Sequence, residues 1–211
     1  MLGLESHPTA PRPRVLSEVT QSAEEKKLKV LGIAGSLRRA SYNRALLRAA
    51  QQLAPANLTL EIFDLTGIPL FNQDSERTPA KEVVEFKARN RAADAILMAT
   101  PEYNYSIPGV LKNAIDWASR PTDDNAWSGK PVAILGASVG QLGTARAQYH
   151  LRQVFVTLNM YVLNQPVAMI SNAAELFDAA GTLTDAETRT RLRRLLEQLA
   201  LWTRQLQSAR A

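Results

Sequence analysis

The chain has 211 residues, of which 25 are basic and 20 acidic, and 45% are hydrophobic, a share typical of one globular domain. It contains no cysteine and only two histidines, His7 and His150, which excludes disulfides, thiolate or multi-histidine metal sites and cysteine nucleophiles. A carboxylate site is the most that remains for a metal, and we predict none. Any redox chemistry therefore needs a bound cofactor.

The sequence also indicates the cellular compartment and whether a membrane or nucleic acid is a partner. No segment reaches the roughly 20 apolar residues of a membrane-spanning helix, and the first residues lack the basic start and apolar core of a secretory signal. We therefore expect a cytoplasmic protein without a membrane partner. Although the net charge is +5, the basic residues are scattered, and those between Arg189 and Arg194 surround a helix instead of lining one face. The charge thus favours small anions, and nucleic acid is not expected as a partner.

Strand-like and helix-like patterns alternate from Leu28 onward, after an N-terminal stretch that contains Pro8, Pro11 and Pro13 and shows no apolar period. Residues 1–27 are therefore predicted to form a flexible N-terminal arm, and residues 28–211 the domain. In chain order, we predict a strand at 28–34, a helix at 43–53, a strand at 58–63, a helix at 80–93, a strand at 95–100, a helix at 108–117, a strand at 131–137, a helix at 143–157, a strand at 161–170 and a helix at 185–207.

Strands that alternate with helices of this length require right-handed crossovers and a parallel sheet covered on both faces. The prediction is a three-layer, doubly wound α/β domain with a five-stranded parallel sheet. Ligands in such folds bind beyond the carboxyl ends of the strands, where the strand order reverses. The loops that follow the first, third and fourth strands are therefore the candidate site.

The first of these loops, Gly35 to Asn43, opens a helix and is suited to a phosphate. A helix N-terminus offers unpaired N–H groups and a partial positive charge. Ser36, Ser41 and Asn43 add short polar groups, and Arg38 adds a positive charge. Neither the GxGxxG fingerprint nor a Walker loop occurs here, so the loop fits a single phosphate better than a dinucleotide or a nucleoside triphosphate.

The second loop, Thr100 to Gly109, holds two prolines and displays two tyrosines, an asparagine and a glutamate. Such a loop can lay peptide groups and aromatic faces against a flat heterocycle. Its composition fits equally well a rigid connection whose tyrosines cover the core, and both interpretations stay open at this point.

The third loop, Gly136 to Gly143, contains the Gly-x-Ser-x-Gly pattern of the nucleophile elbow of α/β-hydrolases. That chemistry needs an acid and then a histidine after the serine. Only His150 follows Ser138, and no acidic residue separates the two. Hydrolysis is therefore excluded, and the glycines predict a loop that exposes N–H groups toward the polar edge of a ring.

The segments GSLRRASYN, PEYNYSIPGVLKNAIDWASRP and GASVGQLGTARAQYHLRQ, in this order, resemble the NAD(P)H-dependent FMN reductase family, specifically its quinone, chromate and azo-dye reductases. The resemblance implies a flavodoxin-like fold and non-covalently bound FMN. It also implies that the phosphate is held by Ser36, Arg38, Ser41 and Asn43. The isoalloxazine would be lined by Pro101, Glu102, Tyr103 and Asn104, with Ser138 and Gly140 near its pyrimidine edge.

The resulting hypothesis is an FMN-dependent NAD(P)H oxidoreductase that passes a hydride from NADPH or NADH through FMN to quinones, chromate or azo compounds. No side chain is predicted to be catalytic, because N5 of the flavin receives the hydride. Backbone donors from Ser138 to Gly140 are expected to stabilise negative charge at the pyrimidine edge. The two substrates are expected to use one site in turn, in a ping-pong mechanism. The alternative is a flavodoxin-type carrier of single electrons, although flavodoxins are typically acidic and this chain is basic.

The resemblance further implies a homodimer or homotetramer. Aromatic and arginine residues, which are enriched in interfaces, lie in the segment Trp117 to Trp127 and at Gln148, Tyr149, His150 and Arg152. Trp127 is expected at an interface because it lies in a polar loop, whereas Trp117 fits a core position nearly as well. His150 is interpreted as an interface or surface histidine and not as a catalytic acid.

Overall fold

The computed structural model describes residues 26–210. Of the predicted arm, residues 1–25 lie outside the described part of the chain. The elements are, in order, β1 (Leu28–Ala34), α1 (Tyr42–Gln52), β2 (Leu58–Phe63), η1 (Gln73–Ser75), α2 (Lys81–Ala92), β3 (Ala95–Ala99), α3 (Gly109–Ala118), η2 (Thr122–Asp124), β4 (Pro131–Ala137), α4 (Ala145–Thr157), β5 (Tyr161–Val162), β6 (Ala168–Ile170), η3 (Ala173–Glu175) and α5 (Ala186–Ser208), where η marks a short 3₁₀ helix.

All strand pairs are parallel, and the strand order is β2-β1-β3-β4-β5, with β6 also paired to β4. The order reverses between β1 and β3, because the chain moves from β1 outward to β2 and then returns to the other side of β1. This is the flavodoxin-like arrangement, whose ligands bind at the reversal point. The predicted fold class, a doubly wound parallel sheet, is confirmed.

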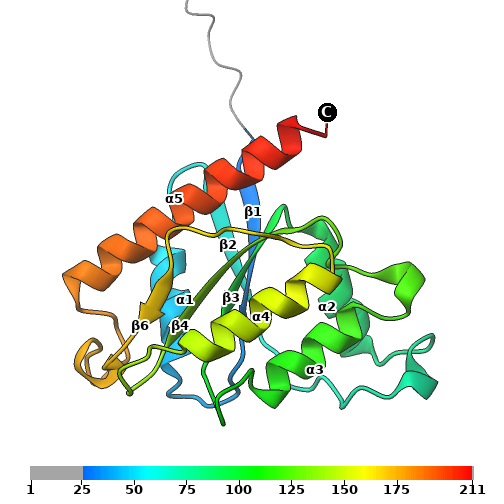
Figure 1. Ribbon diagram of the computed structural model, residues 1–211, viewed down its shortest axis with the longest axis horizontal. Helices are drawn as coiled ribbons and strands as arrows, with labels where there is room; N and C mark the ends of the chain where they lie inside the picture. Colours follow the sequence, from blue (N-terminus) through cyan, green and yellow to red (C-terminus); the bar gives the residue numbers. More distant parts are fainter. Residues whose placement is uncertain (1–25, 211) are drawn as a thin grey trace, which may run out of the picture.

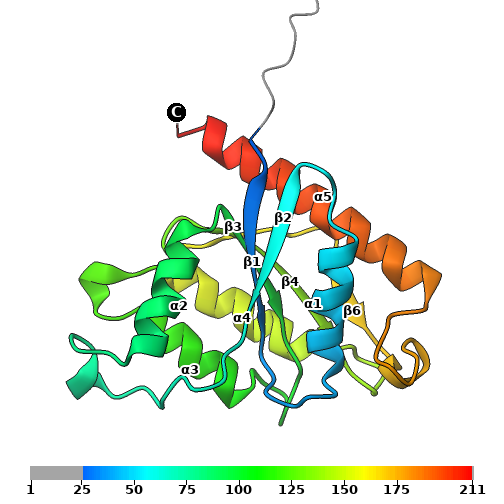
Figure 2. The ribbon, with the colours of Figure 1, turned by 180° about the vertical axis from the view of Figure 1, so that it is seen from behind.

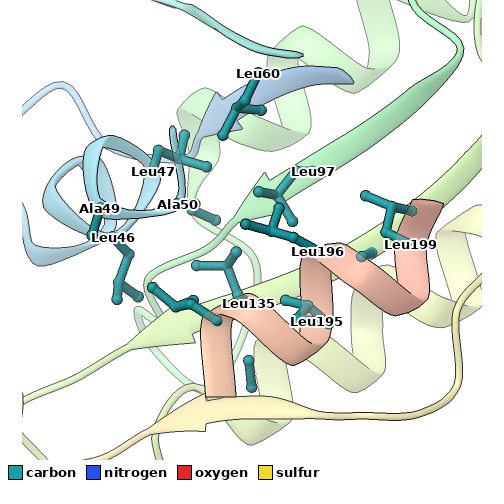
Figure 3. Packing of buried hydrophobic residues seen from close by; sticks show 14 of the residues in the cluster. Leu46, Leu47, Ala49, Ala50, Leu60, Leu97, Leu135, Leu195, Leu196 and Leu199 are labelled. Atoms are coloured by element: carbon teal, nitrogen blue, oxygen red, sulfur yellow. The ribbon is translucent and has the colours of Figure 1, made fainter. Parts of the chain in front are cut away.

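The sheet is covered on both faces, as Figures 1 and 2 show from opposite sides. On one face α1 and α5 pack against the sheet, and Figure 3 shows leucines of both helices, among them Leu46 and Leu196, meeting Leu97 and Leu135 of the strands. On the other face α2, α3 and α4 enclose a second cluster around Phe86, Ile115 and Phe155. Two apolar faces explain why β3 and β4 are buried at every position.

The last strand differs from the prediction of one continuous strand at 161–170. β5 pairs with Pro131 and Val132, and β6 pairs with the segment Leu135 to Ala137, so residues 163–167 face only two residues of β4. Pro166 has no N–H to donate to a ladder, and the Arg152 guanidinium binds Leu163 O (3.3 Å) and Asn164 Oδ1 (3.0 Å) of the excluded segment. Five residues cannot pair with two, so the segment 163–167 leaves the sheet as a loop, and Arg152 binds this loop.

The prediction that Trp127 lies at an interface is wrong. Its side chain is completely buried, its Nε1–H donates to Ile115 O (3.0 Å), and its ring contacts Phe86 edge-on at a centroid distance of 5.8 Å. Trp117 is also buried, with its Nε1–H on Pro69 O (2.8 Å). The prediction relied on the polar residues before Trp127. The loop folds back, however, and inserts the indole between α2 and α3.

Among residues 26–210, no helix combines the length and the apolar character that a membrane span requires.

Candidate functional site

Three loops meet where β1, β3 and β4 end, at the lower edge of the sheet in Figure 1. Together they line a cavity of about 330 Å³. Eight of the ten residues predicted from the sequence line it, namely Ser36, Arg38, Ser41, Asn43, Pro101, Glu102, Tyr103 and Ser138. Asn104 and Gly140 do not belong to the lining. The topology thus gathers residues that lie up to about a hundred positions apart in the sequence.

One end of the cavity is the N-terminus of α1. Ser41 is the N-cap, and its Oγ accepts a hydrogen bond from the N–H of Arg44 (3.4 Å). The first N–H groups of a helix have no acceptor within the helix and point outward with a partial positive charge. Ser36 is buried beside them, and the Arg38 side chain is exposed at the rim. Neutral hydroxyls, free N–H groups and one guanidinium are the donor set of a phosphate site.

Asn43 has a different use from the phosphate contact that was predicted for it. Its Nδ2 donates to Ala137 O (3.0 Å) and its Oδ1 accepts from Ala137 N–H (2.9 Å), so the amide group bridges the start of α1 and the end of β4. The side chain is almost completely buried. A direct contact with a phosphate is left to the second Nδ2 hydrogen, and the main role of Asn43 is to hold the first and third loops together.

The second loop is a tight turn from Tyr103 to Ser106, whose backbone groups bond each other in both directions (3.2 and 2.9 Å). Asn104 and Tyr105 have positive φ angles of 49° and 65°, as the two central residues of a type I′ turn require. The turn carries Asn104 outside the cavity and leaves Tyr103, a residue that is 57% exposed, at the mouth. An aromatic face is therefore available to a flat ligand.

Glu102 lines the cavity, but its carboxylate is directed to α4. It accepts hydrogen bonds from the N–H groups of Arg146 (3.0 Å) and Ala147 (3.2 Å), and it pairs with the Arg146 guanidinium. That guanidinium also lies 3.5 Å from the centroid of the Tyr105 ring. Glu102 thus caps α4 and fixes the second loop to it. Arg146 was not among the predicted site residues, and its charge, opposite to that of Glu102, was the only signal for the pair.

In the third loop, two of the N–H groups that were predicted to face a ligand have acceptors within the protein. Ser138 N–H donates to Ile170 O (3.0 Å), and Gly140 N–H donates to Ser138 Oγ (3.1 Å). The N–H groups of these two residues are thus not free donors, contrary to the prediction. Val139, between them, is exposed and lines the cavity, and its N–H has no acceptor within residues 26–210. Of the three N–H groups from Ser138 to Gly140, it is the one that remains for a ligand.

The predicted interface positions on α4 separate into different environments. His150 is partly buried, and its Nδ1 lies 2.9 Å from Ser106 Oγ. Gln148 is buried, with its Nε2 donating to Ala168 O (3.1 Å), so its place on an exposed face is a wrong prediction. The reason is that Gln148 faces the sheet, one residue away from Tyr149, whose side chain is 60% exposed.

Comparison with known proteins identifies the class of this site. The family model described as NADPH-dependent FMN reductase matches residues 28–175. The chain belongs to this family. The match covers all three loops and every predicted site residue, and it confirms the prediction of an FMN enzyme that uses NAD(P)H.

The matches to individual relatives of this FMN reductase extend over nearly the whole length of each relative. An NAD(P)H-dependent FMN reductase of Pseudomonas aeruginosa is 55% identical over 180 residues, which are 85% of this chain and 97% of the relative. A 2-hydroxy-1,4-benzoquinone reductase of Burkholderia sp. is 44% identical over 177 residues, 84% of this chain and 97% of the relative. Among solved structures, an NAD(P)H:(acceptor) oxidoreductase from Paracoccus denitrificans has 36% identity and a TM-score of 0.78, covering 84% and 98% of the two chains.

The residues of this FMN reductase fit the flavin that the family uses. The N-terminus of α1 with Ser36, Ser41 and Arg38 would hold the phosphate. Tyr103 and the backbone of Pro101 would face the ring, and Val139 N–H is placed to meet a polar ring edge. The chemistry of each donor matches the part of the cofactor assigned to it.

Proposed function

We propose that this FMN reductase is an NAD(P)H:quinone oxidoreductase that reduces its acceptor by two electrons. The observation that carries the proposal is that one cavity is lined both by the helix N-terminus suited to an anion and by a loop with an exposed aromatic face. The names of the relatives, which include a benzoquinone reductase and several NADPH:quinone oxidoreductases, support quinones as acceptors.

FMN, when bound, supplies hydride and electron transfer, and the protein supplies binding and orientation. The charge of Arg38 and the N-terminus of α1 neutralise the phosphate. The ion pair of Glu102 with Arg146 and the amide bridge of Asn43 to Ala137 keep the three loops at fixed distances, so the ring site is formed in advance. No proton donor is assigned to the chain, because His150, which is bonded through Nδ1 to Ser106, does not line the cavity.

We infer that donor and acceptor use one position in turn. FMN would fill the cavity of about 330 Å³ with its ring against Tyr103, which leaves one face of the ring at the mouth for a flat molecule. NAD(P)H would therefore have to leave as its oxidised form before a quinone could enter. Chromate and azo dyes are proposed as further acceptors, because an open mouth places little restriction on acceptor shape.

The kinetic order tests this proposal. With purified protein, saturating FMN and NADPH varied at several fixed benzoquinone concentrations, double-reciprocal plots should be parallel, and kcat/KM for the quinone should exceed that for chromate or an azo dye. Intersecting lines would contradict the shared position. Binding of FMN without any turnover of quinone, chromate or azo dye would instead favour the electron-carrier alternative.

The working form is proposed to be a homodimer or homotetramer. Large apolar side chains are exposed on the three loops and on α4, namely Leu37, Tyr105, Val139, Leu142 and Tyr149. Burying them against a second copy would remove apolar surface from water and add walls to an open site. Light scattering of the FMN-loaded protein at micromolar concentration should give at least twice the 23.2 kDa of one chain. A monomer with full turnover would contradict this.

A further inference from the structure

A second cavity of about 610 Å³ adjoins the FMN cavity on the other side of the α1 N-terminus. Arg38, Ser41 and Tyr42 line both cavities, so these three residues form the boundary between them. The far wall of the second cavity is the segment from Ala174 to Gly181, which follows β6 and η3. None of the functions assigned above uses this space.

The cavity is strongly cationic. Arg38, Arg39 and Arg48 line it, against the single carboxylate of Asp178, which already accepts a hydrogen bond from Thr182 N–H (2.8 Å). Elsewhere on α1, Arg44 is paired with Asp64. Within residues 26–210, by contrast, neither Arg39 nor Arg48 has a carboxylate partner. Unpaired guanidinium groups that converge on a hollow are typical of a phosphate site.

Aromatic side chains and a hydrogen-bonded loop segment also line the cavity. The rings of Tyr42 and Phe177 lie 5.3 Å apart, inclined by 37°, and small alanine side chains at 179 and 180 continue the apolar part. The wall segment is closed by bonds between Asp178 and Thr182 (3.0 Å) and between Gly181 N–H and Asp178 O (2.9 Å). A cavity that combines aromatic surface with phosphate-binding cations suits a phosphorylated nucleoside.

The location of the larger cavity, next to the FMN cavity, indicates which phosphorylated nucleoside it binds. FMN carries one phosphate, and the smaller cavity already provides its cradle at Ser36, Ser41 and the α1 N-terminus. Arg39 and Arg48 line only the larger cavity. The other phosphate-bearing molecule that must approach this mouth is the nicotinamide dinucleotide. Its adenosine end carries an additional 2′-phosphate in NADPH but not in NADH, and arginine is the residue that accommodates this group in dinucleotide sites.

We propose that the cavity of Arg39 and Arg48 binds the adenosine 2′-phosphate end of NADPH and makes the enzyme prefer NADPH over NADH. The inference rests on the proposed function, since it takes NAD(P)H as the donor. The two guanidinium groups contact the 2′-phosphate, and the half-buried ring of Tyr42, which the buried Phe177 supports from behind, contacts the adenine.

Binding of adenosine 2′,5′-bisphosphate and of 5′-ADP to the FMN-loaded protein, measured by calorimetry, tests the site without any turnover. The wild type should bind the 2′-phosphorylated compound at least tenfold more tightly. Arg39→Ala and Arg48→Ala should each remove most of this difference, and Arg48→Lys should keep part of it. Arg193→Ala, an exposed arginine of α5 outside the cavity, is the matched control and should change nothing.

Kinetics and FMN affinity complete the test. Both alanine variants should raise KM for NADPH about tenfold, with KM for NADH and the Kd for FMN unchanged. Equal binding of the two adenosine compounds, or equal effects on both dinucleotides, would overturn the proposal. A large loss of FMN affinity would overturn it as well, because the arginines would then serve the flavin phosphate. Absence of quinone turnover in the wild type would refute the proposed function alone.

Discussion

Replacing Trp127 with alanine should lower the free energy of unfolding by about 3–5 kcal/mol, the range for deleting a large buried aromatic side chain. The indole is completely buried, and its removal leaves a cavity beside Phe86 and takes one of its two hydrogen bonds from the Ile115 carbonyl, which keeps the bond from Ser119 N–H. Urea unfolding of the apo-protein, followed by far-UV circular dichroism, measures the change. The chain provides its own control in Trp202, which is only partly buried and donates to Tyr161 O (3.1 Å).

Trp202→Ala should cost clearly less, because more of its side chain is already in water. An equal loss for both variants would contradict the core role of Trp127. So would a Trp127→Ala protein that keeps its stability but has a smaller mass in light scattering, since that result would restore the interface position.

The second large effect is expected at Asn43, although its side chain is small. Asn43→Ala removes both partners of Ala137 and leaves a buried N–H and a buried C=O unpaired, each at a cost of about 1–3 kcal/mol. The free energy of unfolding should therefore fall by about 2–6 kcal/mol. The affinity for FMN should fall too, because the phosphate loop is no longer tied to the end of β4.

Asn43→Asp separates the two consequences. The aspartate keeps the oxygen that accepts from Ala137 N–H but loses the donor, so its stability should lie between the wild type and Asn43→Ala. Its negative charge stands at the N-terminus of α1, where it repels a phosphate, so its FMN affinity should be the lowest of the three. Chemical denaturation and fluorescence titration with FMN give the two orders. Identical orders in both measurements would show that Asn43 has one role and not two.

The sequence predicted the order of the elements because each depends on a local pattern. Apolar runs ending at Gly35, Thr100 and Gly136 indicated buried parallel strands, and the parallel topology alone brings the loops that follow them to one edge. Eight site residues could therefore be placed together without knowledge of any contact between them.

The side-chain pairings could not be predicted in the same way. The Asn43 bridge joins residues 94 positions apart, and the pair of Glu102 with Arg146 joins residues 44 positions apart. Many short polar groups follow these strands, and no local pattern selects the partner of each. The burial of Trp127 could not be predicted for a related reason. Its neighbours in sequence are polar, whereas its neighbours in space are Phe86 and Ile115.

The interruption at residues 163–167 also affects how copies of the chain can meet. An edge strand with a continuous row of unpaired N–H and C=O groups can template a strand from another molecule, which leads to fused sheets or aggregates. Here β5 offers two ladder positions and β6 three, with a loop between them. This margin of the sheet is too short and too irregular to be extended. Association on this side must therefore use side chains of helices and loops.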